Sequence, residues 1–297
     1  MNVTFIVLTY ERPRILQTCL QTLFLNTEIR PVETWILDDG SSPPLQDALL
    51  KLSQDHRLKG NTINLILGGR NYGIGYNFER AYNIMRQSDS DIVAFIESDY
   101  IWRKGYLEDV LAVFEASPWT VAIAGVDHPD MYLREKTHRT FVDLMKEQFG
   151  KDLGARDSLY IPFDLDTRLG KIKVQGVSNS CGCQLVHWGR LKQLLDDEDL
   201  EKEYWKWMDR AFHKNGTGDR RLASDAHMSG TLSFFSEKWM KRFGVDITKN
   251  FGMLSIIPSI SSHICGGGIN GMIVGEGETF VVSPTWRDEY LTKNPRS

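Results

Sequence analysis

Through residues 1–103, short apolar runs alternate with segments in which apolar side chains recur every three or four positions. The runs predict buried strands, and the recurring pattern predicts helices with one apolar face. We expect strands at Val3–Leu8, Thr34–Leu37, Ile63–Leu67 and Asp91–Ile96, and helices over residues 15–23, 45–52 and 75–85. This alternation predicts an α/β fold in which a mostly parallel sheet is flanked by helices.

The pattern beyond residue 103 is less regular, and it contains no internal repeat and no linker that would divide the chain. Charged residues and prolines predict an irregular segment over 128–165, and glycines predict a loop at Ser261–Gly268. The expected strands are Val121–Ala124, Lys171–Val177, Gln184–His187 and Thr279–Val282. The expected helices are Tyr106–Phe114, Thr140–Phe149, Trp188–Leu195 and one that Ser224 caps, from Asp225 towards Phe235.

A polar cluster stands directly after each of the first four strands. These clusters are Thr9–Pro13, Asp38–Ser42, Gly68–Gly69 and Glu97–Asp99. In open α/β sheets, ligands bind outside the carboxyl ends of the strands. The order of elements therefore predicts a polar ligand site at that edge of the sheet.

Composition narrows the class of protein. The chain has 297 residues, of which 41% are hydrophobic, so it is long enough for a large core and too apolar for a disordered protein. The net charge of -4 argues against a general nucleic-acid coat, although it leaves room for a local basic groove. No apolar run reaches the ~18–20 residues of a membrane helix, and the first run predicts a strand rather than a signal peptide. Four scattered cysteines do not make a disulfide scaffold, so we expect a cytoplasmic protein.

Glu97 and Asp99 are the first candidates for chemistry. Alternate residues of an extended strand point the same way. Two carboxylates at this spacing can hold one hard divalent cation, with diphosphate oxygens completing the coordination. Two solvated acids in a turn are the alternative.

Two further strand ends carry candidate nucleotide ligands. In the segment D-D-G-S, Asp38 or Asp39 can accept a hydrogen bond from a ribose hydroxyl or a base N–H, or the segment forms an Asx turn. The segment G-G-R-N-Y-G-I-G after the third strand matches neither the dinucleotide fingerprint nor a P-loop. Arg70, beside backbone amides at a helix start, still suits a diphosphate.

Asp225 and His263 are candidates from the second half of the chain. Asp225 either favours the dipole of the helix it starts or acts as a general base towards an acceptor hydroxyl. His263 is either structural or a ligand for a transition metal. Cys181 and Cys183 are one residue short of C-x-x-C, which argues against zinc, and no G-x-S-x-G elbow supports a serine hydrolase.

The motifs and their order along the chain resemble those of the GT-A nucleotide-sugar transferases, especially glycosyltransferase family 2. The segment T-Y-E-R-P after the first strand resembles the family's T-Y-N-R-P, and D-D-G-S matches the family's segment closely. Residues 70–83 resemble its N-x-G-x-x-x-A-x-N helix start. Glu97–Asp99 stands where the D-x-D metal motif stands, Ser224–Asp225 where an E-D pair stands, and Pro258–His263 where P-S-x-x-x-H stands.

The resemblance implies a GT-A (Rossmann-like) fold and a single domain, 1–297. Residues 1–103 would bind the nucleotide-sugar, and an irregular half, 104–297, would bind the acceptor and close the metal site. It implies Mn²⁺ or Mg²⁺ held by Glu97, Asp99 and His263, with Asp225 as the catalytic base. The implied nucleotide-sugar site consists of Thr9, Tyr10, Arg12, Asp38, Asp39, Arg70, Asn71, Gly73, Glu97 and Ser98.

The activity that the resemblance implies is an inverting transfer of a sugar from a nucleoside diphosphate-sugar, commonly a UDP-sugar, to a hydroxyl of a soluble acceptor. The acceptor is a saccharide, a protein or a modified DNA base. Aromatic residues in segments 128–166 and 202–221 either form its wall or fill a core; they are Tyr132, Tyr204, Trp205 and Trp207. A nucleotidyltransferase of similar architecture and a non-catalytic nucleotide-sugar-binding module are the alternative functions.

Overall fold

The computed structural model describes residues 1–58, 60–125, 163–177, 183–212, 225–263, 271–273 and 279–281. Its main sheet has nine strands in the order β3-β2-β1-β4-β9-β6-β10-β8-β7. These strands are β1 (Val3–Thr9), β2 (Glu33–Asp38), β3 (Ile63–Ile66), β4 (Ile92–Glu97), β6 (Ala122–Ala124), β7 (Phe163–Thr167), β8 (Gly170–Gly176), β9 (Cys183–His187) and β10 (Met253–Ile257). Only β9 and β8 run against the others in this sheet, so the prediction of a mostly parallel sheet is confirmed.

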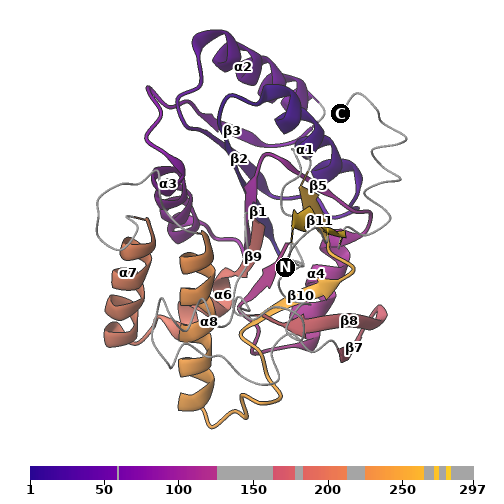
Figure 1. Cartoon of the computed structure of the whole chain (residues 1–297), viewed down its shortest axis with the longest axis vertical. Helices are drawn as coiled ribbons and strands as arrows, with labels where there is room; N and C mark the ends of the chain where they lie inside the picture. Colours follow the sequence, from indigo (N-terminus) through magenta and orange to yellow (C-terminus); the bar gives the residue numbers. More distant parts are fainter. Residues whose placement is uncertain are drawn as a thin grey trace.

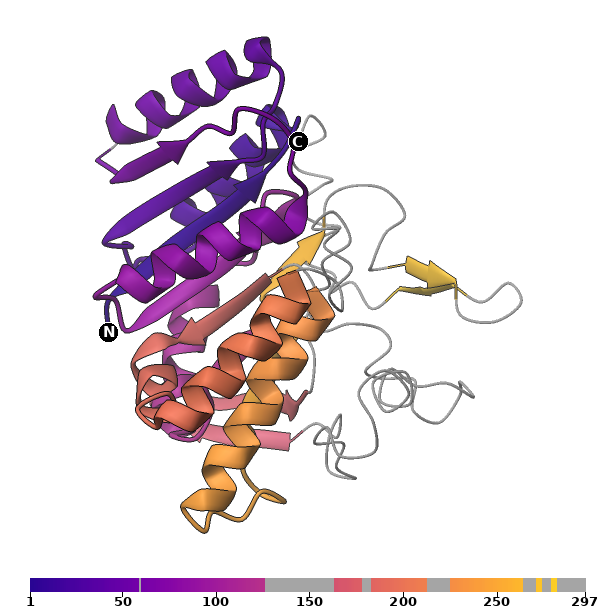
Figure 2. The same cartoon turned by 90° about the vertical axis from the view of Figure 1, so that its left-hand side faces the viewer.

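Helices cover both faces of the sheet, as Figures 1 and 2 show. In Figure 1, α3, α6, α7 and α8 lie to the left of the sheet, and α1 and α4 lie to its right. The helices are α1 (Pro13–Leu25), α2 (Pro43–Leu58), α3 (Ile74–Gln87), α4 (Tyr106–Ala116), α6 (Trp188–Leu194), α7 (Glu198–Phe212) and α8 (Asp225–Arg242). In the described part of the chain, no helix combines the length and apolarity that crossing a bilayer requires.

The core lies along the central strands. All residues of β1 are buried, because helices cover both of its faces and strands flank both of its sides. The continuous apolar runs that predicted these strands follow from that position. Each fully buried Ile, Leu or Phe contributes about 1.5–3 kcal/mol to folding, so this part of the sheet is a rigid platform for the loops at its ends.

The second half contains elements that the sequence pattern did not predict. Two strands, β5 (Tyr100–Trp102) and β11 (Ser261–His263), form a small antiparallel sheet, so the first three residues of the predicted loop Ser261–Gly268 are a strand. A further pair comprises β12 (Gly271–Ile273), which was not predicted, and β13 (Thr279–Val281), which confirms the strand expected at Thr279–Val282. The strands β7 and β10 and the helix α7 were also missed, while the predicted helix Thr140–Phe149 lies outside the described residues.

The aromatic residues of α7 belong to helix packing. Tyr204 is buried against Phe235 of α8, and Trp205 packs edge-on against Tyr82 of α3. The guanidinium of Arg86 lies 4.5 Å from the centre of the Trp205 ring. Of the two alternatives for these aromatic residues, an acceptor wall or a core, the structure supports the core for Tyr204 and Trp205.

Candidate active site

The carboxyl ends of β1, β2 and β4 meet at one edge of the sheet. The strand register places Thr9 beside Asp38 and Leu8 beside Glu97. The Asp39 N–H donates to the Thr9 carbonyl oxygen at 3.0 Å, and the Ser98 N–H donates to the Leu8 carbonyl oxygen at 2.9 Å. The two acidic motifs therefore stand on either side of the end of β1.

A cavity of about 480 Å³ opens between these strand ends. Most of the predicted site residues line it. The lining consists of Leu8, Thr9, Tyr10, Arg12, Asp39, Asn71, Gly73, Ile74, Asn77, Glu97, Ser98 and Asp99. Asp38 and Arg70, which were predicted with them, are not part of this lining.

Asp38 holds a turn instead of facing the cavity. One carboxylate oxygen accepts hydrogen bonds from the Gly40 N–H at 3.1 Å, the Ser41 N–H at 3.0 Å and the Gln46 side chain at 3.1 Å. The other accepts from the Ser41 hydroxyl. This is the Asx-turn alternative, realised by the first of the two aspartates.

Asp39 fastens the loop after β3 to the end of β2. Its two carboxylate oxygens accept from the Tyr72 N–H at 3.0 Å and the Gly73 N–H at 2.8 Å. Burial raises the pKa of this carboxyl, and the two amides partly offset the rise. The side chain therefore shapes the cavity by positioning Gly73, where α3 begins.

Glycine at position 40 is required by its surroundings. Its φ is +75°, in the left-handed region, and an added Cβ would lie 2.1 Å from the carbonyl carbon of Arg70. The loops after β2 and β3 thus touch backbone to backbone. Arg70 itself is exposed, with its guanidinium 4.5 Å from the centre of the Tyr72 ring, which accounts for its place outside the cavity.

Glu11 ties the loop after β1 to the same assembly. It has a φ of 54°, which costs a non-glycine residue about 1–2 kcal/mol. Its N–H donates to the Ser41 hydroxyl at 2.8 Å, and its carboxylate accepts from the Ser42 N–H at 2.6 Å. Together with the contact between Gly40 and Arg70, these bonds hold three strand-end loops in one arrangement.

Thr9 offers the cavity an unused hydroxyl. The residue is 4% exposed, and its Oγ1 has no hydrogen-bond partner among the described residues. A buried hydroxyl without a partner costs free energy that a polar ligand would recover. The buried Thr9 hydroxyl in the cavity lining therefore favours a polar ligand there.

Glu97 and Asp99 are the acids that line this cavity beside the end of β4. Asp99 is buried and forms an ion pair with Arg12, whose side chain is half-exposed. No group of three metal-ligating side chains occurs in the parts of the chain that the structure describes. The carboxylates of Glu97 and Asp99 therefore suit Mg²⁺ or Mn²⁺, provided that phosphate oxygens supply the further ligands.

Two helices begin at the cavity. Pro13 follows Arg12 at the start of α1, and Gly73 precedes α3 with a φ of 92°. Neither N-cap residue supplies a side-chain hydrogen bond to its helix. The first N–H groups and the positive dipole ends therefore favour an anion at the cavity.

The two later candidates are placed only by their backbones. Asp225 is the first residue of α8, and His263 pairs with Tyr100 in the β5–β11 ladder, one residue beyond Asp99. The side chains of both lie outside the described residues, as does the whole of Ser224. Their roles stay predictions.

Sequence reasoning missed three lining residues, Leu8, Ile74 and Asn77. Asn77 is the most informative, because it is 2% exposed and its Oδ1 accepts from Arg80 at 3.0 Å, which leaves the amide N–H groups for a ligand. Asn77 lies one helical turn beyond Gly73. The helical spacing from Gly73 was the signal that could have identified it.

An open, mostly parallel sheet with a polar cavity at its carboxyl edge defines an α/β protein that binds its ligand at the strand ends. More particularly, the chain belongs to the Glycosyl transferase family 2, whose model matches residues 4–182.

The chain is also similar to individual proteins. The succinoglycan biosynthesis protein ExoW of Rhizobium meliloti (strain 1021) is 29% identical over 134 residues, which are 42% of this chain and 39% of ExoW. The galactosyltransferase LgtC, solved with donor and acceptor sugar analogs, is 13% identical with a TM-score of 0.47, and the match covers 98% of this chain and 94% of LgtC. The mannosyltransferase PcManGT from Pyrobaculum calidifontis, in complex with GDP-Man and Mn²⁺, is 15% identical with a TM-score of 0.43, covering 66% of this chain and 46% of PcManGT.

Proposed function

We propose that the chain is an inverting glycosyltransferase that moves a sugar from a UDP-sugar to a hydroxyl group of a saccharide. Its nucleotide-sugar half is residues 1–103, and residues 104–297 bind the acceptor. Membership of the Glycosyl transferase family 2 supports this class of reaction. The name of the relative ExoW, a succinoglycan biosynthesis protein, favours a saccharide over a protein or a modified DNA base as the acceptor.

The observation that carries the proposal is the cavity at the carboxyl edge. Its volume of about 480 Å³ is in the range of small-molecule sites. The Thr9 hydroxyl and the Asn77 amide offer hydrogen bonds to a nucleoside, while Arg12 and the starts of α1 and α3 offer positive charge to a diphosphate.

Glu97 and Asp99 would hold the divalent cation, with His263 as the third protein ligand. When bound, the cation supplies charge stabilisation for the leaving diphosphate. Arg12 pairs with Asp99 in the structure, and its half-exposed side chain can turn towards a phosphate instead.

Asp225 would act as the general base. A carboxylate in that role accepts the proton of the acceptor hydroxyl as the oxygen attacks the anomeric carbon from the face opposite the leaving diphosphate. Attack from that face inverts the configuration at the carbon. The new C–O bond forms as the bond to the diphosphate oxygen breaks, and the diphosphate leaves with the electron pair.

The proposal is tested with a panel of nucleoside diphosphate-sugars and saccharide acceptors, read by product mass and by NMR of the anomeric configuration. We expect UDP release coupled to a product of inverted configuration, and Asp225→Asn should abolish transfer while sparing donor binding. Retained turnover in Asp225→Asn moves the role of base to Asp209 or Asp219. In a parallel assay with UTP and a sugar 1-phosphate, pyrophosphate release would indicate a nucleotidyltransferase, and donor binding without turnover in either assay would indicate a binding module.

A further inference from the structure

A second cavity, of about 810 Å³, lies at the opposite edge of the sheet from the candidate active site. It is lined by the turn that precedes β6 and by the ends of α6 and α8. Because β6 and β4 both pair antiparallel with β9, they run in the same direction, and the start of β6 is at the edge away from the carboxyl ends. No residue of the candidate active site contributes to this cavity.

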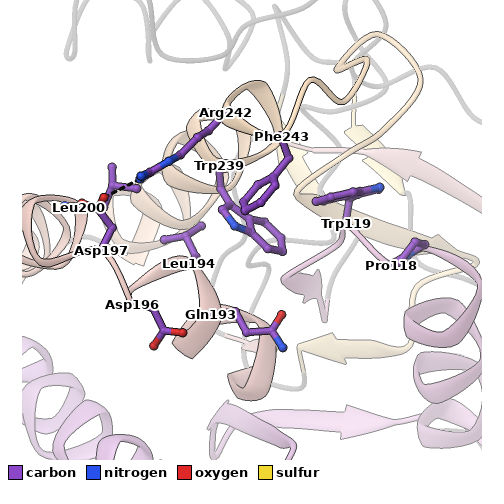
Figure 3. Close-up of a pocket in the computed structure, with 10 residues that line it drawn as sticks. All are labelled: Pro118, Trp119, Gln193, Leu194, Asp196, Asp197, Leu200, Trp239, Arg242 and Phe243. Atoms are coloured by element: carbon purple, nitrogen blue, oxygen red, sulfur yellow. Dashed lines mark hydrogen bonds and ion pairs between the residues drawn. The ribbon is translucent and has the colours of Figure 1, made fainter.

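Three aromatic rings form one wall of this cavity. The centre of the Trp239 ring lies 5.1 Å from that of Trp119 and 5.7 Å from that of Phe243. Figure 3 shows Trp239 at the centre with Phe243 beside it and Trp119 across from it. Trp239 is buried, Trp119 is partly exposed and Phe243 is 62% exposed, so the wall is anchored in the core but presents aromatic surface to solvent.

The end of α8 explains the exposure of Phe243. Gly244 has a φ of 67° and donates its N–H to the Lys241 carbonyl oxygen, while the Val245 N–H donates to the Met240 carbonyl oxygen. These two bonds form a Schellman turn, which ends α8 at Arg242, directly before Phe243. The aromatic surface is therefore held by an ordered turn.

The polar side of the cavity consists of an ion pair and of two side chains whose hydrogen-bonding groups are not used by other described residues. Asp197 accepts from the N–H groups of Leu200 and Asp199 and pairs with Arg242 at 2.6 Å, and these bonds lower its pKa. The exposed side chains of Gln193 and Asp196 make no hydrogen bond to another residue that the structure describes, and both lie below Trp239 in Figure 3.

We infer that this cavity is a second saccharide-binding site, separate from the transferase site. The polarised C–H groups of a pyranose ring pack well on the negative face of an aromatic ring. The hydroxyls of the same ring can donate to a carboxylate, accept from a guanidinium and exchange hydrogen bonds with an amide. Rings with all hydroxyls equatorial, as in β-linked glucose chains, present the flattest C–H faces and are the saccharides that this wall fits.

The charge of the cavity lining favours a neutral saccharide over an anionic membrane surface. The cavity carries Asp196 and Asp197 against Arg242 as its cation, so phosphate headgroups would meet a net acidic lining. The cavity is an open hollow between the turn before β6 and the end of α8, which can receive one face of a sugar ring, but its described lining presents no protruding apolar surface to a bilayer beyond Phe243.

The test is a titration of the full chain with cellotetraose, followed by tryptophan fluorescence and calorimetry. We expect millimolar or tighter binding, weakened at least about tenfold in Phe243→Ala and in Trp119→Ala and about threefold in Asp196→Ala and in Gln193→Ala. Leu25→Ala removes a 79% exposed apolar side chain elsewhere and is the matched control, which should bind cellotetraose as the wild type does. UDP binding should be unchanged in all these variants, so the outcome is independent of the proposed transferase activity.

Three results would overturn the inference. The first is no binding of cellotetraose at about 10 mM, a concentration that detects even weak saccharide sites. The second is binding that Phe243→Ala and Asp196→Ala leave unchanged, which would locate the saccharide elsewhere. The third is a loss, in Phe243→Ala, of binding to phosphatidylglycerol vesicles or of self-association, with no saccharide binding in the wild type, which would identify a membrane or a second copy as the occupant.

Discussion

At the carboxyl edge of the sheet, loops meet backbone to backbone, with Gly40 against Arg70 and the Asp39 carboxylate on two amides. At the opposite edge, the cavity is lined mainly by side chains from the ends of helices, such as Trp239 and Phe243. The first cavity cannot change without disturbing the strand ends, whereas the second can lose an exposed side chain and keep its framework. This difference predicts how each region responds to substitution.

The largest effect is expected for Gly40→Ala. The new Cβ would lie 2.1 Å from the carbonyl carbon of Arg70 at a φ of +75°, so unfolding free energy should fall by about 3–5 kcal/mol. Gly60→Ala is the matched control, because Gly60 has a φ of 84° with nothing within 4 Å, and it should cost about 1–2 kcal/mol. Urea unfolding measures both, and equal losses would show that the close approach to Arg70 does not matter.

Asp39→Asn should have the next largest effect. The nearly isosteric amide turns an NH₂ group towards the N–H of Tyr72 or Gly73, and stability should fall by about 2–3 kcal/mol. Asp196→Asn makes the same change in the opposite cavity, where the carboxylate is exposed, and should leave stability unaltered. Thermal unfolding of the two variants compares the edges directly, and similar losses would contradict the contrast drawn between them.

Acid should weaken the opposite edge through His187, which stands where β9 passes into α6. Burial, with Arg190 nearby, lowers its pKa from 6.5 to about 4. As the pH falls, the unfolded chain takes up the proton before the folded chain does. The contribution of His187 to the unfolding free energy is therefore complete above about pH 6.5 and is lost towards pH 4. After allowance for the partial exposure of His187, the unfolding free energy falls by about 1–2 kcal/mol.

The raised pKa of Asp39 acts in the opposite sense, because the contribution of Asp39 to stability is present at low pH and is lost as the pH rises.

The variant His187→Asn tests the role of His187, because it keeps an acceptor at the start of α6 and removes the imidazole. Unfolding free energies at pH 7 and pH 4.5 should differ less in this variant than in the wild type. An unchanged difference would exclude His187 as the source.

Phe243→Ala should have the smallest effect on folding. The side chain is 62% exposed and follows the last residue of α8, so its removal should cost less than about 1 kcal/mol. Chemical unfolding of this variant provides the measurement. A loss as large as that of Gly40→Ala would mean that the aromatic wall is part of the core.

The two edges also differ in how far the sequence predicts them. The carboxyl-edge cavity was predicted because buried parallel strands are continuous apolar runs that end abruptly at polar residues, as at Thr9 and Glu97. Asp38 and Arg70 were placed in it by their motifs and by their positions after a strand or before a helix. Which of two adjacent aspartates faces a cavity depends on turn geometry, and that geometry comes from contacts with another loop.

No sequence motif predicted the cavity at the opposite edge. Trp119, Asp196 and Trp239 come from three distant segments, and only the tertiary packing brings them together. The insertion of β9 between β4 and β6 is likewise a long-range pairing that local pattern does not encode. The aromatic residues of α7 left two alternatives open in the sequence, because Tyr204 and Trp205 suit a sugar platform and a helix interface equally well by residue type.

The central claim is that the carboxyl-edge cavity binds a nucleoside diphosphate together with a divalent cation. Calorimetric titration of UDP into the wild type and Asp99→Ala, each with and without Mn²⁺, tests it most directly. We predict that Mn²⁺ tightens UDP binding at least about tenfold in the wild type and has no effect in Asp99→Ala. A wild type that binds no nucleoside diphosphate in either condition, or an equal Mn²⁺ effect in both proteins, would contradict the claim.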